Sequence, residues 1–359
     1  MLCAVSIGAE VHVQKEGISF SGAAGIRGLA CLLVVVIHSI SFFFNGLFKY
    51  LNGSGKIGVW LFFVLSAFLL TVKFMRTGFD FRAIAYYLNG RILRIIPLFS
   101  IVVFIYYYFG TAGIDTFEDL KAALFFDKAY AHLWTIPVEF KFYFILPLLA
   151  GVLIFLRRKF GVGAVLIVSA LSIFSHQVLA PYWNTPTNGV TTYWYLPSFL
   201  FGCIAAVLFD TTRKWVTPAS SAVVGLMCVV LIFMMTGWAR NTFFGMPLDG
   251  WLQNKFIFLS AILTVFLLAF IEPKGVGASI FESPVFKKAG EWSFSIYLIH
   301  WLIVVKLSDL YPGSLLWMLV AIVASIFAGA ALYMLVEKPI ERFRHSIERA
   351  SIRRRSETA

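Results

Sequence analysis

Ionisable side chains are rare inside the long apolar stretches of this sequence, and the exceptions are His38, Glu139, Lys141 and His300. A charge at the centre of a bilayer costs about 2.5 to 3.5 kcal/mol even on a lenient insertion scale, so such residues are candidates for function. An imidazole suits proton transfer or nucleophilic attack near neutral pH, and a carboxylate can orient an imidazole. These residue types therefore indicate acid–base or nucleophilic chemistry inside a helix bundle.

The depth of these residues predicts which of them meet. Arg27 and His38 are eleven residues apart on one helical face, which separates them by about 16 Å along the axis. Counted from the expected ends of their helices, Glu139 lies about 12 Å from the outside and His300 about 12 Å from the cytoplasmic face. In a hydrocarbon core about 30 Å thick, we expect His38, Glu139 and His300 to share one buried layer.

Each of these residues also has a purely structural interpretation. His38 and His300 could each form a single hydrogen bond between helices. Glu139 could pair with Lys141, although a separation of two residues points the two side chains to different helix faces. The sequence leaves these alternatives open.

A pair of arginines follows a helical spacing of three residues. Arg91 and Arg94 lie on one face at the expected cytoplasmic mouth of a span, with Pro97 following. They could anchor the span by the inside-positive rule. Equally, two guanidinium groups could bind phosphate bidentately on the side where phosphate-bearing cofactors occur.

The elements that must position these residues are apolar helices. Of the 359 residues, 60% are hydrophobic and 13% are charged, with a mean hydropathy of +0.85. A soluble domain carries about 25% charged residues, so a soluble enzyme and a disordered protein are excluded. Cys31, Cys203 and Cys228 lie inside apolar runs and do not form a secreted disulfide framework. The predicted fold class is all-α, a polytopic membrane helix bundle.

Apolar runs of about 20 residues predict about ten transmembrane helices. They cover residues 26–48, 57–75, 92–110, 131–156, 161–180, 192–209, 219–238, 254–271, 290–310 and 315–336.

The basic residues predict the orientation of these helices. Thirteen Lys and Arg residues fall in or at the edges of the even-numbered connections, counting Lys73 and Arg94 just inside the flanking spans, and five fall in the odd-numbered ones, which places the even connections and both termini in the cytoplasm. The net charge of +12 is then explained by anionic lipid headgroups, so we expect the lipid bilayer as a partner and no nucleic acid. The expected domains are a cytoplasmic N-terminal segment over 1–25, an integral-membrane domain over 26–336 and a basic cytoplasmic tail over 337–359.

A set of ordered motifs resembles acyltransferase family 3, integral-membrane enzymes that O-acylate the sugars of surface glycans. The motifs are residues 26–30 followed by His38-Ser39, the second-span element 58–69, the Arg-x-x-Arg-x-x-Pro element 91–97, the fourth-span element 133–143, the elements 197–202 and 290–300, and Glu337-Lys338-Pro339. The chain differs from the usual family pattern at Ala67, where glycine is common, and at Phe140-Lys141.

The resemblance implies an acyl-CoA donor, with acetyl-CoA as the first candidate, and a glycan or lipid-linked saccharide acceptor. It implies that Arg27, Arg91 and Arg94 bind the donor's phosphates, that His38 is the catalytic base or a transient acyl carrier, and that Glu139 orients it. Ser66, Lys141 and His300 are weaker candidates that would line the tunnel. It further implies a bacterial inner membrane and a stand-alone transferase. No metal-ligand spacing or phosphate loop occurs, so we expect no metal and no tightly bound cofactor.

A second class of function fits the same buried residues. A transporter or flippase of a lipid-linked sugar or an anionic small molecule would also need many spans and intramembrane His and Glu residues. Such proteins usually carry internal repeats and paired broken helices, and neither pattern is visible here.

Overall fold

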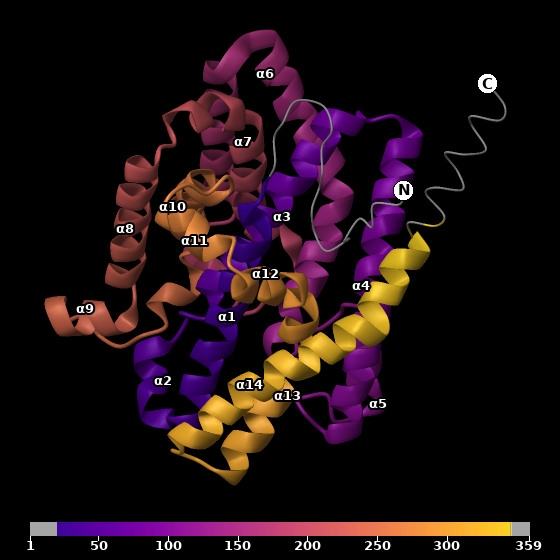
Figure 1. Cartoon of the computed structure of the whole chain (residues 1–359), viewed down its shortest axis with the longest axis vertical. Helices are drawn as coiled ribbons and strands as arrows, with labels where there is room; N and C mark the ends of the chain where they lie inside the picture. Colours follow the sequence, from indigo (N-terminus) through magenta and orange to yellow (C-terminus); the bar gives the residue numbers. More distant parts are fainter. Residues whose placement is uncertain (1–19, 345, 347–359) are drawn as a thin grey trace.

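The computed structural model describes residues 20–344 and 346, and within them it is built from helices with no β-strand. The predicted all-α membrane bundle is confirmed. The helices are α1 Gly22–Phe43, α2 Asn45–Leu51, α3 Lys56–Thr77, α4 Phe81–Phe109, α5 Phe117–Leu124, α6 Thr135–Leu179, α7 Leu196–Thr212, α8 Pro218–Met234, α9 Gly237–Phe244, α10 Phe256–Phe270, α11 Val276–Phe281, α12 Pro284–Glu291, α13 Ser293–Leu310 and α14 Leu315–Leu332 (Figure 1).

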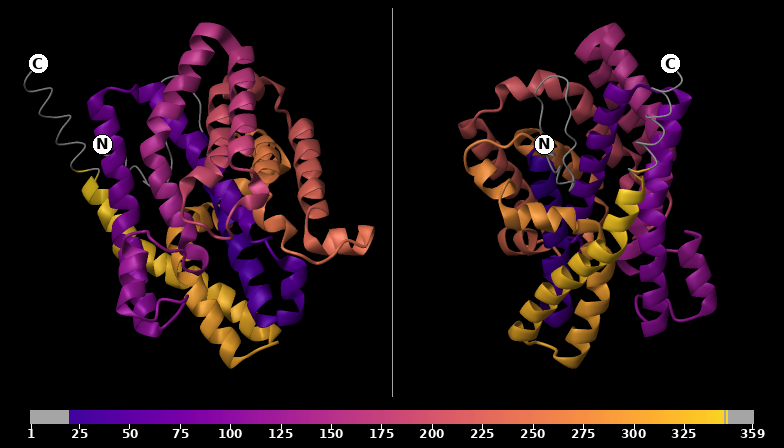
Figure 2. Two further views of the ribbon diagram at one scale, coloured as in Figure 1. Left: turned by 180° about the vertical axis from the view of Figure 1, so that it is seen from behind. Right: turned by 45° about the vertical axis from the view of Figure 1, so that its right-hand side comes forward.

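Seven helices of the described residues are long and apolar enough to cross a membrane, and an eighth crossing is possible at the bent pair α8 and α9. Each of the ten predicted spans nevertheless overlaps a helix, although 26–48 runs over the break between α1 and α2 and 219–238 over the break between α8 and α9. Two of them fall on α6, which is interrupted at Gly161, where φ is +83° and ψ is −168° (Figure 2). A third falls on α10, which has only 15 residues. The number of membrane crossings therefore stays a prediction.

Helix α1 is held in the middle of the bundle by close contacts through small residues. A Cβ added to Gly28 would lie 2.2 Å from the carbonyl oxygen of Phe286, and one added to Gly290 would lie 1.8 Å from that of Ala24. On the other side, a Cβ at Gly58 of α3 would lie 2.4 Å from the carbonyl oxygen of Ala30. Small residues let helix backbones approach this closely in membrane proteins. The two ends of α1 that carry Arg27 and His38 are thereby enclosed by α3, α12 and α13.

Aromatic rings fill the centre of the bundle between α3, α6 and α7. The rings of Phe63 and Phe199 stack at a centroid distance of 4.4 Å, and Phe142 stacks on the other side of Phe199 at 3.8 Å. Trp60 packs against Trp134 and Tyr195, and all of these rings are buried. This core fixes α3 and α6 relative to each other, and both helices carry site residues.

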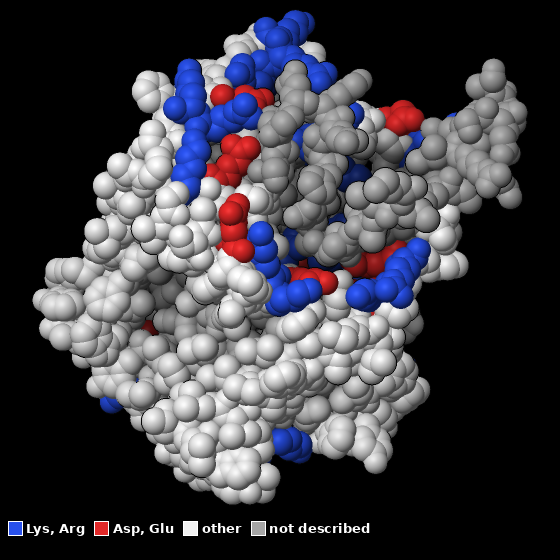
Figure 3. Space-filling view, viewed as in Figure 1, with Lys and Arg blue, Asp and Glu red and all other residues white. Residues whose placement is uncertain are grey.

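The charged residues gather at one end of the visible face. In Figure 3 the Lys and Arg side chains lie mainly in the upper half of the view, whereas α2 and the turn between α13 and α14 lie at the lower end. The upper end is the one that the positive-inside rule assigns to the cytoplasm. The side on which each connection lies remains a prediction.

The beginning of the predicted tail is helical. After α14 the chain forms a π-helix over Tyr333–Glu337 and continues as helix to Arg344. Glu337 is buried and accepts a hydrogen bond from Ser295 at 2.8 Å. Apart from Ser346, the remaining tail lies outside the described residues, as do the first nineteen residues of the predicted N-terminal segment.

Candidate active site

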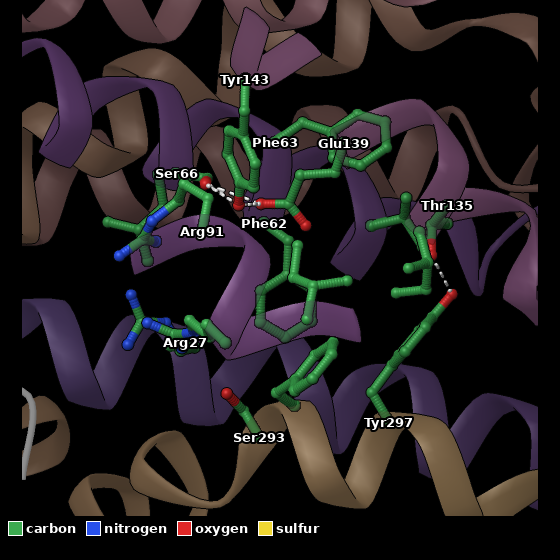
Figure 4. A pocket seen from close by; sticks show the side chains of 16 residues that line it. Arg27, Phe62, Phe63, Ser66, Arg91, Thr135, Glu139, Tyr143, Ser293 and Tyr297 are labelled. Atoms are coloured by element: carbon green, nitrogen blue, oxygen red, sulfur yellow. Dashed lines mark hydrogen bonds between the residues drawn. The ribbon is translucent and has the colours of Figure 1, made fainter. Parts of the chain in front are cut away.

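A pocket lies between α1, α3, α4, α6 and α13. One side of it is basic, and its far side carries hydroxyl groups (Figure 4). It is lined by Arg27, Val59, Phe62, Phe63, Leu65, Ser66, Arg91, Arg94, Ile95, Thr135, Ile136, Glu139, Tyr143, Ser293, Phe294 and Tyr297.

The three arginines named from the sequence line this one pocket. Arg27 comes from α1, whereas Arg91 and Arg94 come from successive turns of α4. The guanidinium carbon of Arg91 lies 5.7 Å from the centroid of the Tyr143 ring, and its buried Nε has no hydrogen-bond partner among the described residues. Converging guanidinium groups, one of them with an unused buried donor, are suited to bind an anion such as phosphate.

Glu139 lies in the same pocket, held by two hydroxyl groups. Its Oε1 accepts hydrogen bonds from Ser66 Oγ at 2.7 Å and from Tyr143 OH at 2.5 Å. The two hydroxyl oxygens are 3.3 Å apart. Figure 4 shows these three side chains pointing toward one another, beside Arg91. Glu139 therefore belongs to the arginine pocket.

His38 and His300 meet in a second layer of the bundle. His38 Nδ1 lies 3.0 Å from His300 Nε2, and the two rings are parallel within 3°. His300 Nδ1 in turn lies 2.7 Å from the carbonyl oxygen of Tyr297. The structure thus confirms that these two histidines share one layer.

His132 completes this layer, and the sequence reasoning did not single it out. Its ring stacks on Trp301 at 5.2 Å and lies 4.8 Å from the His300 ring between centroids. The side chain is buried, and neither ring nitrogen has a hydrogen-bond partner among the described residues. The sequence feature that could have identified His132 is its place as the second residue of the predicted span 131–156.

The expected contact between Glu139 and His38 is absent from the described residues, and this prediction is wrong. The depth count put the outer boundary of the fourth span at residue 131. In the structure the 3₁₀ turn Ala131–Trp134 already lies in the histidine layer, because His132 packs on His300. Glu139 is seven residues further along, which places it about 10 Å deeper, among the arginines.

A pair of hydroxyl groups separates the pocket from the histidine layer. Thr135 Oγ1 donates a hydrogen bond to Tyr297 OH at 3.0 Å, and Tyr297 OH donates to the carbonyl oxygen of His132 at 2.7 Å. Thr135 and Tyr297 both line the pocket, opposite Arg27 and Arg91 in Figure 4. A molecule that extends from the arginines to His38 must pass these two side chains.

Lys141 does not line the pocket. Its side chain is exposed, and its Nζ donates to the carbonyl oxygen of Phe126 at 3.3 Å. The expectation that Lys141 lines the tunnel is therefore not met, and Glu139 does not pair with it. In the part of the chain that the structure covers, no three His, Cys, Asp or Glu side chains are grouped to hold a metal ion.

Comparison with known proteins gives a consistent match. The sequence profile of a family described as an acyltransferase domain matches residues 22–335. One relative is a protein of Staphylococcus aureus strain COL that is named as a candidate O-acetyltransferase. It is 24% identical to this chain over 336 residues, which cover 81% of this chain and 51% of the relative.

Two relatives named O-acetyltransferase OatA, from Staphylococcus aureus strains NCTC 8325 and COL, match with the same identity and coverage. The chain therefore spans about half the length of the curated relatives it matches. No solved structure matches this chain.

Proposed function

The chain belongs to the family of membrane acyltransferase domains, and on that premise we propose that it moves an acyl group from acyl-CoA to a sugar hydroxyl. The donor is acetyl-CoA in the first instance, supplied from the cytoplasm. The acceptor is a cell-surface polysaccharide or a lipid-linked saccharide in a bacterial inner membrane. The observation that supports this most strongly is one pocket that gathers three arginines, with the hydrogen-bonded pair Thr135 and Tyr297 between it and the imidazoles of His38 and His300.

The arginine pocket suits the phosphate end of the donor. A CoA molecule carries a diphosphate and a further phosphate, and guanidinium groups bind such oxygens with charge-assisted hydrogen bonds. Arg27, Arg91 and Arg94 approach the same pocket volume from two helices. Glu139 supplies a negative charge beside them, which limits the repulsion between three half-buried cations before the donor binds.

The reactive end of the donor would lie in the histidine layer. Arg27 and His38 stand on one face of α1, about 16 Å apart along its axis. A donor whose phosphates rest on the arginines therefore has to extend its thioester arm past Thr135 and Tyr297 to reach His38. His38 then acts as general base on the acceptor hydroxyl or carries the acyl group transiently.

The test is transfer by the wild-type protein alone. Inverted membrane vesicles from a bacterial host that lacks its own enzyme of this type are prepared with and without this chain. They are supplied with acetyl-CoA labelled in the acetyl group, and alkali-labile label in the saccharide fraction is counted. We expect label only in vesicles that contain the chain. Equal label in both preparations would contradict the proposal, and uptake of a lipid-linked saccharide without label would favour a flippase.

A further inference from the structure

The hydrogen bonds of the histidine layer fix the direction of their protons. The carbonyl oxygen of Tyr297 can only accept, so His300 Nδ1, at 2.7 Å from it, carries a proton. His300 is fully buried in an apolar bundle, where the neutral imidazole is favoured over an unpaired cation. A neutral ring has a single N–H, which leaves a lone pair on His300 Nε2. That lone pair accepts the proton of His38 Nδ1 at 3.0 Å.

The other nitrogen of His38 is consequently unprotonated. With its proton on Nδ1, a neutral His38 presents a lone pair on Nε2. Which nitrogen of a histidine acts as the base is set by the bond that the other nitrogen makes. The carbonyl of Tyr297 thus determines, through His300, that Nε2 of His38 is the basic atom.

A glycine lies close to His38 Nε2, where any larger residue would crowd this nitrogen. A Cβ added to Gly55 would lie 3.1 Å from His38 Nε2 and 3.4 Å from its Cδ2. Gly55 precedes the first residue of α3, in the connection from α2 that the charge distribution assigns to the outside. His38 is partly exposed, in contrast to His300. The basic nitrogen therefore faces the outer connection, away from the arginine pocket.

We propose that His300 is a positioning residue that fixes the tautomer of His38, and that the acceptor hydroxyl binds at His38 Nε2 beside Gly55. This inference rests on the proposed function and specifies the acceptor half of its site. The donor's thioester reaches His38 from the arginine side, and the saccharide reaches it from the side of residues 52–56. The two substrates meet at one imidazole without sharing an entrance.

The reaction at this position balances with the two substrates alone. His38 Nε2 takes the proton of the acceptor hydroxyl while the hydroxyl oxygen bonds to the thioester carbonyl carbon. The carbon–sulfur bond then breaks, and the departing thiolate takes the proton back from His38. The products are an ester and the CoA thiol, and His38 returns to the neutral tautomer with the proton on Nδ1.

The first test compares His300→Gln with His300→Leu. The glutamine amide can place an acceptor oxygen close to the position of Nε2, whereas leucine removes the acceptor. Purified protein in matched amounts is reconstituted into vesicles made from the host's own membrane lipids and lipid-linked saccharides. We expect His300→Leu to lower kcat by about 10²-fold, within the range of general-base catalysis. The KM for acetyl-CoA should stay unchanged, and His300→Gln should recover most of kcat.

Two results of this comparison would overturn the role of His300. One is a kcat of His300→Leu equal to that of the wild type. The other is a folded His300→Gln variant whose kcat is no higher than that of His300→Leu.

The acceptor position is tested by a pair of glycine variants. Gly55→Ala should lower transfer relative to Gly46→Ala, because Gly46 has no neighbouring atom within 4 Å of an added Cβ. Equal transfer by these two variants would contradict the placement of the acceptor.

A second measurement tests the tautomer without relying on activity. In protein labelled with ¹⁵N-histidine, the His38 signals are identified by their loss in His38→Ala. We expect a protonated Nδ1 and an unprotonated Nε2 in the wild type, and a mixture of tautomers in His300→Leu. The opposite tautomer in the wild type would contradict the positioning role. If the wild-type protein shows the expected tautomer but transfers no acyl group, the result would instead contradict the proposed function.

Discussion

Three half-buried cations in one pocket are costly unless something compensates their charge. Glu139 lies beside Arg27 and Arg91 in the pocket, and Ser66 and Tyr143 hold its carboxylate in place. Glu337 and Glu341 lie near Arg94, where the three line a second, smaller pocket. At the scale of single residues, the arginines are therefore partly compensated before the donor binds, and the phosphates of a polyanionic donor would add to this compensation.

The affinity for acyl-CoA should depend on the arginines of the pocket. We expect Arg94→Ala to raise the KM for acetyl-CoA by about tenfold to a hundredfold, because a hydrogen bond to a charged group is worth about 1.5 to 3 kcal/mol. Arg82→Ala is the matched control, since Arg82 is an exposed arginine in the first turn of the same helix. Label transfer is measured against acetyl-CoA concentration in vesicles. An equal KM for the two variants would remove the pocket from donor binding.

Residue types and spacing predicted much of this site, but not all of it. The helical period placed Arg27 and His38 on one face, and the same reasoning grouped Arg91 with Arg94. The predicted depth of Glu139 was wrong because counting residues from the end of the span assumed a regular helix that starts at the membrane surface. A short 3₁₀ turn that already lies inside the bundle has no signature in hydropathy, so His132 was also missed.

At the scale of elements, the contacts of α1 with α3 and α12 decide where Arg27 and His38 lie. These contacts are made by backbone atoms at glycines, so no side chain can adapt to an added group. The sequence pattern located α1 well because its apolar run is continuous. It could not reveal which helices α1 touches, since glycines in an apolar span do not indicate their partners.

Gly290 should be the most sensitive of these contact positions. A Cβ at Gly290 would lie 1.8 Å from the carbonyl oxygen of Ala24, so Gly290→Ala forces α12 away from α1. We expect a loss of about 1 to 3 kcal/mol or more, as in other overpacked interiors. Thermal unfolding in detergent measures the effect, with Gly163→Ala as the control because Gly163 has no atom within 4 Å of an added Cβ. A Gly290→Ala variant as stable as this control would contradict the packing described.

The helix α6 shows a second limit of reasoning from hydropathy. The two predicted spans 131–156 and 161–180 correspond to its two parts, on either side of the non-helical Gly161. The apolar runs indicated the parts correctly because the basic residues 157–159 interrupt them. Local sequence does not determine whether both parts cross the bilayer, because that depends on how deeply the bundle is embedded.

At the scale of the whole molecule, the asymmetry of charge predicts which end faces the cytoplasm. The break in α6 lies toward the basic end, and the connection between α2 and α3 lies toward the other. This arrangement gives donor and acceptor separate entrances only if the positive-inside orientation holds.

Labelling of introduced cysteines tests this orientation. Glu118→Cys on α5 and Lys159→Cys beside the break in α6 are both exposed positions. Each is introduced into a Cys3→Ser chain, in which the remaining native cysteines, Cys31, Cys203 and Cys228, are buried. We expect a membrane-impermeant thiol reagent added to intact cells to label Glu118→Cys and to leave Lys159→Cys unlabelled until the membrane is permeabilised. The reverse pattern would invert the topology, and with it the assignment of the donor side.

The most direct test of the account is the effect of His38→Ala on two quantities at once. Acetyl transfer to saccharide and equilibrium binding of labelled CoA are both measured in vesicles at matched protein levels. His176→Ala is the control, because the His176 side chain forms hydrogen bonds only with Gln177 and the Tyr193 carbonyl among the described residues. The account predicts that His38→Ala abolishes transfer and retains binding, since the arginine pocket lies about 16 Å from His38 along α1. Transfer by His38→Ala at the wild-type rate would contradict it.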